Sequence, residues 1–201
     1  MIQKQIEELK EHVTLMARRA EAILDMALET LDKKEENLFQ QTVSMDRELN
    51  SMEIQMDEKC MRLLALQEPF ALDFRYIFSS IKTTRDLERI GDESKTIARW
   101  SLRLPGGQVT PELKELASKA REALKEAIHA LVNSDLDSAN KVLQLELEVD
   151  AIEEKILEVS TDISQALIVR ALERIGDLST NIAENVIFSV KAQDIRHSTD
   201  K

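Results

Sequence analysis

The chain has 201 residues, of which 43% are hydrophobic, 32% are charged and only 3% are aromatic. This length suits one or two small domains, and the shortage of aromatic and turn residues disfavours a sandwich or barrel of strands. A formal net charge of −11 argues against nucleic acid as a main partner, because phosphate binding requires a basic face. We therefore expect an all-α protein whose acidic surface suits cations or basic protein partners, or serves solubility alone.

The first residues lead directly into an amphipathic pattern, and no run of 18 apolar residues occurs. This pattern predicts a soluble, cytoplasmic protein. The single cysteine, Cys60, cannot form an internal disulfide, and its place in a helix-period stretch predicts a buried thiol.

Apolar residues recur at intervals of three and four through the first hundred residues and predict three helices. The first helix is expected over 2–31, with a polar turn at 32–36. The second ends near Pro69, because proline disfavours a helical conformation in the residue before it. The third covers about 71–102.

The segment 105–110 is the clearest break in the chain, since it combines a proline with two adjacent glycines. We predict that it links a first domain, 1–104, to a second domain, 111–201. The dipeptide Thr110-Pro111 has the pattern of an N-cap followed by proline at the first helical position.

Three more helices are predicted in the second domain. The fourth ends at a turn over 133–135, the fifth ends at the capping cluster 160–162, and the sixth ends at about Lys191. The remaining residues, 192–201, form a short polar tail. With such short connections, each domain is predicted to be an antiparallel three-helix bundle.

A six-residue sequence, Leu-Glu-Arg-Ile-Gly-Asp, occurs at 87–92 and again at 172–177. Around it, ten of the fourteen residues of 85–98 are identical to those of 170–183. A match of this length at a fixed offset indicates an internal repeat that relates the two bundles.

Each copy of the motif has a glycine in the interior of its predicted helix, Gly91 in the first and Gly176 in the second. Glycine at such a position costs about 0.5–1 kcal/mol relative to alanine. We therefore predict that a neighbouring helix, or a metal ion, approaches closely at both positions.

Each copy also has two carboxylates four residues apart, Glu88 with Asp92 and Glu173 with Asp177, which places each pair on one helix face. Polar stripes in the preceding helices have the same order in both bundles. The stripes are Asp46, Asn50 and Glu53 in the first bundle and Glu146, Asp150 and Glu153 in the second.

In each bundle, the polar stripe and the carboxylate pair lie nearly the same number of residues from the turn that joins their two helices. This holds although the second hairpin is about 15 residues shorter. Because antiparallel helices rise equally, this balance predicts one carboxylate cluster in each bundle. Clusters of oxygen ligands suit Mg²⁺, Mn²⁺, Ca²⁺ or iron. The alternative is a network of ion pairs with the arginines of the same turns, Arg85, Arg89, Arg170 and Arg174.

The duplicated motif in two three-helix bundles resembles the PhoU family of phosphate-transport regulators. The segments 181–188 and 194–197 are similar to that family's C-terminal bundle, and the likeness covers about 5–197. It implies a cytoplasmic, dimeric regulator. Because no catalytic set of residues is visible in the sequence, we expect no enzymatic activity. Its implied partners are the phosphate-specific ABC transporter and a membrane sensor histidine kinase, and it would reach the membrane only through them.

The resemblance also implies multinuclear metal sites on the bundle surfaces, with iron, zinc, manganese or magnesium. The implied ligands in the first bundle are Asp46, Glu53, Glu88 and Asp92. Those in the second bundle are Glu146, Asp150, Glu173 and Asp177, with Glu153 as a further candidate. Three features depart from the family pattern: Asn50, which should weaken the first site, Thr96 where the second copy has Asn181, and the short second hairpin.

Two other classes of function compete with a regulator that keeps the kinase inactive when phosphate is plentiful. Di-iron oxidases also hold carboxylates in helical bundles, but they need two Glu-x-x-His pairs. This chain has one such pair, Glu126 with His129, outside both clusters, and it has no nucleophile triad or phosphate loop. The other competitor is a helical adapter that binds its partner without metal.

Overall fold

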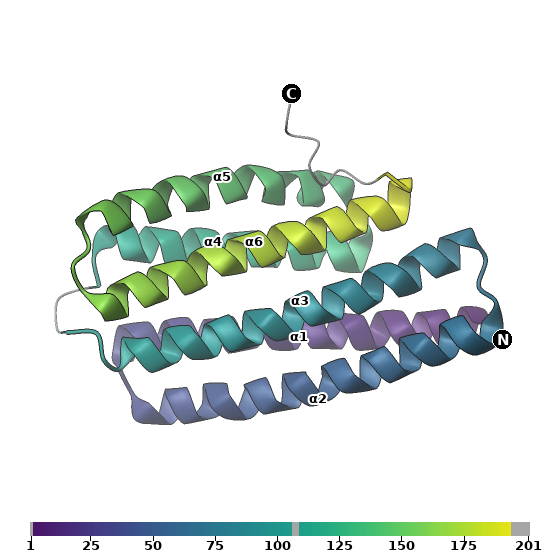
Figure 1. Ribbon diagram of the computed structural model, residues 1–201, viewed down its shortest axis with the longest axis horizontal. Helices are drawn as coiled ribbons and strands as arrows, with labels where there is room; N and C mark the ends of the chain where they lie inside the picture. The colour runs from purple at the N-terminus through teal and green to yellow at the C-terminus, as the bar shows by residue number, and fades with distance from the viewer. Residues whose placement is uncertain (1, 106–108, 194–201) are drawn as a thin grey trace.

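The computed structural model describes residues 2–105 and 109–193, and this part of the chain contains six α-helices. They are α1 (Ile2–Lys33), α2 (Glu36–Gln67), α3 (Ala71–Ser101), α4 (Pro111–Asn133), α5 (Leu136–Val159) and α6 (Ile163–Lys191). Helices α1–α3 form one antiparallel three-helix bundle and α4–α6 form a second (Figure 1). The predicted fold class is confirmed.

The helix ends follow the capping signals in the sequence. The Thr110 hydroxyl accepts a hydrogen bond from the Leu113 amide at 3.2 Å, with proline at the first helical position of α4. At the start of α6, the Asp162 carboxylate accepts one from the Gln165 amide at 2.9 Å. The first turn is shorter than predicted and consists only of 34–35.

Parts of two predicted segments lie outside the described residues. The linker 105–110 includes 106–108, and the tail includes 194–201, which contains the segment 194–197 used in the family resemblance. The division of the chain into 1–104 and 111–201 therefore stays a prediction.

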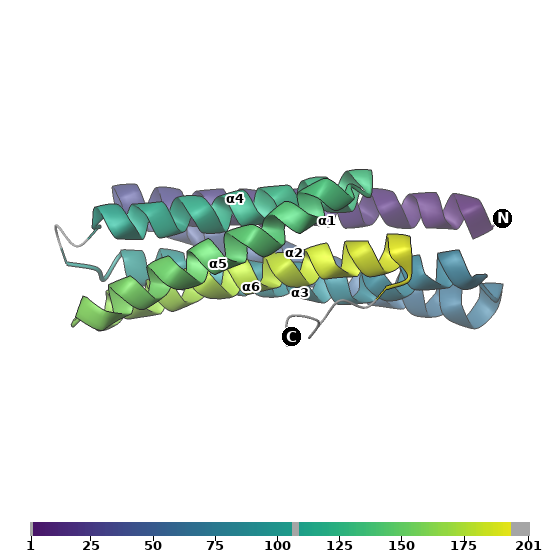
Figure 2. The same ribbon diagram turned by 90° about the horizontal axis from the view of Figure 1, so that it is seen from above.

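The two bundles pack side by side, with α3 against α6 and α1 against α4 (Figures 1 and 2). Their buried apolar side chains form one continuous core that runs through both bundles. Cys60 is fully buried in this core, as predicted, and burial raises the pKa of its thiol to about 12. The bundles therefore share a single hydrophobic interior.

Helix α3 contacts α1, α2 and α6, and several of its buried residues are small. The hydroxyls of Ser80, Thr84, Ser94 and Ser101 each donate a hydrogen bond to the carbonyl four residues earlier in the same helix. These bonds satisfy the buried hydroxyls without a partner from another helix, so neighbouring helices can approach α3 closely.

Exposed ion pairs join the bundles at the surface. The Arg121 guanidinium of α4 donates two hydrogen bonds to Asp25 of α1, at 2.6 and 3.1 Å. Arg174 of α6 lies 3.1 Å from Glu93 of α3. Because exposed pairs contribute at most about 1 kcal/mol, the shared core holds the bundles together.

The α2–α3 hairpin extends beyond the end of the second bundle (Figure 1). Three phenylalanines of this hairpin, Phe70, Phe74 and Phe78, are 86%, 47% and 37% exposed. The ring of Phe78 makes an edge contact with Phe188 of α6. Within the described residues, no helix combines the length and apolarity that a membrane span needs.

Candidate metal centre

The repeated motif packs α3 against α2 and α6 against α5. A methyl group at Gly91 would lie 2.8 Å from Leu49 Cδ2 and 3.3 Å from Asp46 Oδ1. A methyl group at Gly176 would lie 3.1 Å from Val149 Cγ1, and Val149 is the repeat equivalent of Leu49. The predicted close approach is confirmed, and in both bundles the neighbour is the preceding helix.

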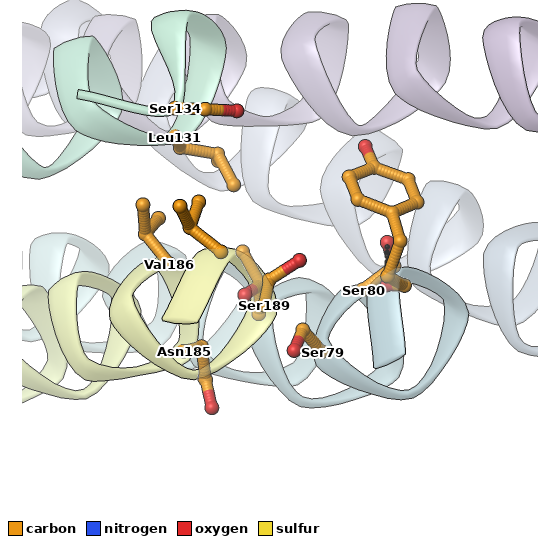
Figure 3. A pocket seen from close by; sticks show the side chains of 10 residues that line it. Ser79, Ser80, Leu131, Ser134, Asn185, Val186 and Ser189 are labelled. Carbon is orange, nitrogen blue, oxygen red and sulfur yellow. Dashed lines mark hydrogen bonds between the residues drawn. The ribbon is translucent and has the colours of Figure 1, made fainter. Parts of the chain in front are cut away.

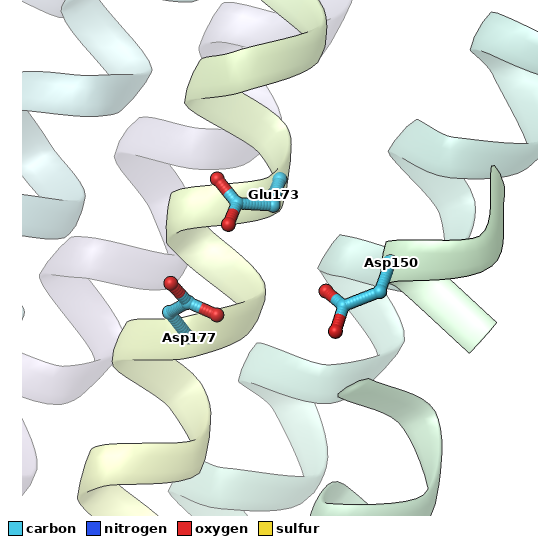
Figure 4. A group of neighbouring side chains, drawn as sticks. All are labelled: Asp150, Glu173 and Asp177. Atoms are coloured by element: carbon cyan, nitrogen blue, oxygen red, sulfur yellow. The ribbon is translucent and has the colours of Figure 1, made fainter. Parts of the chain in front are cut away.

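In the second bundle this approach brings Asp150 of α5 opposite Glu173 and Asp177 of α6 (Figure 4). One oxygen from each carboxylate lies within 4.8 Å of the other two. Across 2–105 and 109–193, no other three potential ligands lie so close together. Hard cations bind carboxylate oxygens at about 2.0–2.6 Å, so these three oxygens can converge on one ion. We call these residues the group of three.

Partial burial and mutual repulsion both act on the group of three, in which Asp150 and Asp177 are exposed and Glu173 is half-buried. Burial is the largest cause that raises the pKa of Glu173 to about 7, and the charges of Asp177, Glu153 and Asp150 raise it further. Burial also raises the pKa values of Asp177 and Asp150. The three carboxylates thus oppose one another's ionisation. A proton on Glu173, which then hydrogen-bonds Asp177, or a bound cation would relieve this repulsion.

The group of three lies in an open groove that further acidic residues line. Two of them, Glu154 and Glu158, were not predicted from the sequence, although their spacing of four and eight residues from Asp150 could have revealed them. On the same wall, Glu153 Oε1 lies 3.4 Å from Arg170 Nη1. The predicted alternative, an ion pair with an arginine, is therefore present at Glu153. It does not separate the three carboxylates of the group of three.

Glu146 is one turn before Asp150 on α5 and flanks the group of three. Burial raises the pKa of Glu146, and the charges of Asp177 and Asp150 raise it further. The five acidic residues predicted for the second bundle thus influence one another, with three at the centre and Glu146 and Glu153 beside them.

The first bundle places a lysine among its predicted ligands. Lys95 Nζ lies 2.5 Å from Asp46 Oδ2 and 2.6 Å from Asp92 Oδ1, and it donates hydrogen bonds to both. The Asp46 side chain is only 4% exposed, and its second oxygen is buried without a hydrogen-bond partner among the described residues. The ion-pair alternative therefore describes Asp46 and Asp92, which pair with Lys95 and not with the predicted arginines.

The other two predicted ligands of the first bundle, Glu88 and Glu53, lie close enough to influence each other. Burial raises the pKa of Glu88, and the charges of Asp92 and Glu53 add to this effect. Burial also raises the pKa of Glu53, while Arg85 and Arg89 act in the opposite direction. These residues do not form a second group of three at the same close spacing within the described chain.

A second hollow lies between α3, α4 and α6 (Figure 3). Its lining consists of aliphatic, hydroxyl and amide groups together with the ring of Tyr76, and it contains no charged side chain. It shares no lining residue with the acidic groove. The hollow thus offers no ligand set for a metal ion.

The single Glu-x-x-His pair lies on the surface of α4 and faces α5. Lys141 Nζ lies 2.9 Å from Glu126, and His129 Nδ1 lies 3.0 Å from the Ser138 hydroxyl. Both side chains of the pair are engaged away from the two carboxylate clusters, so they do not complete a di-iron ligand set there.

Comparisons with known proteins agree with this architecture. A family model described as the PhoU domain matches residues 13–101 and again 113–186. A Pseudomonas putida protein named "Phosphate-specific transport system accessory protein PhoU homolog" is 36% identical, over 96% of this chain and 82% of its own length.

Two solved structures are also similar to this chain. The crystal structure of PhoU from Pseudomonas aeruginosa has a TM-score of 0.88 at 32% identity, and the match covers 96% of this chain and 100% of that one. The phosphate transport system regulatory protein PhoU from Streptococcus pneumoniae has a TM-score of 0.86 at 22% identity, with 96% and 99% covered, and supports the fold.

Proposed function

The chain belongs to the PhoU family, and from this premise we propose that it is a negative regulator of the phosphate-starvation response. In this role it couples the phosphate-specific ABC transporter to a membrane sensor histidine kinase and keeps the kinase inactive when phosphate is plentiful. The observation that carries the proposal is the 36% identity, over 96% of the chain, to a protein named as an accessory of the phosphate-specific transport system.

The second part of the proposal is a metal site at Asp150, Glu173 and Asp177, flanked by Glu146 and Glu153. Three carboxylate oxygens within 4.8 Å, without a lysine among them, support it. Such ligands suit magnesium, manganese and iron, and the family resemblance adds zinc. When bound, a cation would add positive charge among the three carboxylates, because Arg170 of the same groove pairs with Glu153 instead.

A cation bound at this site would connect α5 to α6. Asp150 projects from α5, and Glu173 and Asp177 project from α6 (Figure 4). Without a cation, these carboxylates repel each other across the helix interface. Shared coordination would turn that repulsion into a link between the helices, which would stiffen the outer hairpin of the second bundle and present a defined surface to a partner.

The partners follow from charge as well as from family. A net charge of −11 favours basic cytoplasmic segments of the transporter and the kinase, and opposite charges steer such encounters. The proposed protein is a cytoplasmic homodimer that reaches the membrane only through these partners. Its role is binding, and it requires no catalytic group.

Deletion of the gene tests the regulatory role. In a strain without a second copy, the deletion should leave phosphate-starvation genes expressed in phosphate-rich medium, measured with an alkaline phosphatase reporter. The wild-type gene should restore repression, and the wild-type protein should capture the transporter and the kinase from solubilised membranes. Normal repression in the deletion strain would overturn the regulatory role.

A further inference from the structure

The ammonium group of Lys95 lies where a metal ion would have to bind in the first bundle. It is within hydrogen-bonding distance of Asp46 and Asp92, which come from two different helices, α2 and α3. In the proposed site of the second bundle, the cation has the same task of joining carboxylates across a helix interface. Lys95 already performs this task with an atom of the chain itself.

The repeat shows how the two clusters diverged. Thr180 is the equivalent of Lys95 in the second copy of the motif, and Asp150 is the equivalent of Asn50 on the preceding helix. Each difference makes the first cluster more positive by one charge. The first cluster therefore has four carboxylates and an ammonium, whereas the second has five carboxylates and no cationic side chain at the equivalent positions.

A lysine and a divalent ion cannot share this position. Lys95 contacts Asp46 Oδ2 at 2.5 Å and Asp92 Oδ1 at 2.6 Å, so a cation on these oxygens would have to displace it. A cation on the other oxygen of each carboxylate would lie beside the ammonium, and the two positive charges would repel each other. Displacing Lys95 would also leave a solvated ammonium with no partner in the cluster. Lys95 holds this place by geometry, because its ammonium donates a hydrogen bond to a carboxylate from each of the two helices.

We propose that Lys95 is a built-in counter-ion that replaces a metal ion in the first bundle, so that this chain binds metal through its second bundle only. The inference rests on the metal site proposed for the second bundle and restricts the chain to that site. It departs from the two-bundle arrangement that the family resemblance implies.

The test transfers the charges of the second cluster to the first. The double substitution N50D/K95T gives the first cluster the side chains that the second has at 150 and 180. Mn²⁺ binding to the full chain is measured by calorimetry and by metal analysis after gel filtration. The double variant E173A/D177A lacks the second site and should not bind Mn²⁺. Adding N50D/K95T to this variant should restore Mn²⁺ binding.

The reciprocal variant D150N/T180K supplies an independent arm, because it gives the second cluster the charges of the first. It should lose Mn²⁺ binding while the helix content measured by circular dichroism stays unchanged. K119T is the matched control. Lys119 also contacts two carboxylates, Glu148 at 2.6 Å and Glu122 at 3.9 Å, but it lies away from both clusters, so Mn²⁺ binding should not change.

Three outcomes separate this inference from the proposed function. If E173A/D177A still binds Mn²⁺ and E88A/D92A loses it, the first cluster binds metal despite Lys95, and the inference is wrong. If the wild type binds no Mn²⁺, the metal site proposed for the second bundle is wrong. In that case, Mn²⁺ binding gained by N50D/K95T supports the role of Lys95, and no gain overturns it. If N50D/K95T does not fold, retention of Mn²⁺ by D150N/T180K overturns it.

Discussion

The interface between α2 and α3 and the interface between α5 and α6 use the same packing but carry different charges. Gly91 faces Leu49 in the first as Gly176 faces Val149 in the second. Beside these matched contacts, the first interface has an ammonium between two carboxylates. The second has the group of three without such an ammonium, and its Arg170 pairs with Glu153. The repeat thus preserves the distance between helices, whereas single substitutions decide what neutralises the acids between them.

The largest expected difference between the interfaces is in metal binding. E173A/D177A should abolish bound Mn²⁺, because it removes two of the three converging carboxylates, whereas E88A/D92A should leave the metal content unchanged. Metal analysis of protein purified without chelator measures both, and circular dichroism checks that helix content is kept. Unchanged metal in E173A/D177A would show that the cluster is assigned wrongly.

The next largest effect concerns the counter-ion itself. K95M leaves Asp46 buried without its ammonium partner and should lower the free energy of unfolding by about 1–3 kcal/mol. The equivalent change in the second bundle, T180V, removes no charge and should alter stability by less than about 1 kcal/mol. Urea denaturation gives both values. Equal losses in the two variants would contradict a special role of Lys95.

The glycines give a smaller contrast. Alanine at Gly91 would gain up to about 1 kcal/mol of helix propensity, but its methyl group would lie 2.8 Å from Leu49 and close to Asp46. We expect G91A to destabilise the chain by about 1–2 kcal/mol, and G176A to destabilise it less because the distance to Val149 is 3.1 Å. Thermal and urea unfolding measure the difference. If both variants were more stable than the wild type, the close approach would not explain the glycines.

The smallest effect is expected at the boundary between the bundles. R174A and R121A each remove an exposed ion pair and should each cost less than about 1 kcal/mol, with nearly additive losses in the double variant. Urea denaturation of the three variants tests this. A loss of several kcal/mol from either substitution would mean that surface charges, rather than the shared core, join the bundles.

The helices and the carboxylate positions were predictable because both depend on spacing along the chain. Periodic apolar residues and caps such as Thr110 and Asp162 give the helix ends nearly to the residue. The repeat relates Glu88 to Glu173 and places each beside a polar stripe. Equal hairpin arms, which are a property of sequence alone, predict that stripe and pair lie side by side in both bundles. Within the described residues, only the second bundle brings three of these carboxylates within 4.8 Å.

The neutralising group of the first bundle was not predictable in the same way. Comparing the repeats shows Lys95 opposite Thr180, but a flexible four-carbon side chain can point to solvent as readily as to Asp46. Only the packing of α3 on α2 decides between these directions. The same limit applies to the contact between α3 and α6, since periodicity identifies an apolar face without identifying the helix that covers it.

Because the core is continuous through α1, α3, α4 and α6, opening one bundle would expose apolar side chains of the other. Ligand occupancy and global opening are then thermodynamically linked, and a ligand at about 100 times its Kd adds about 2.7 kcal/mol to the stability of the whole chain. Slower amide exchange would therefore extend from the acidic groove to helices that never contact the ion. A partner bound to the first bundle could sense the occupancy of the second through this shared rigidity.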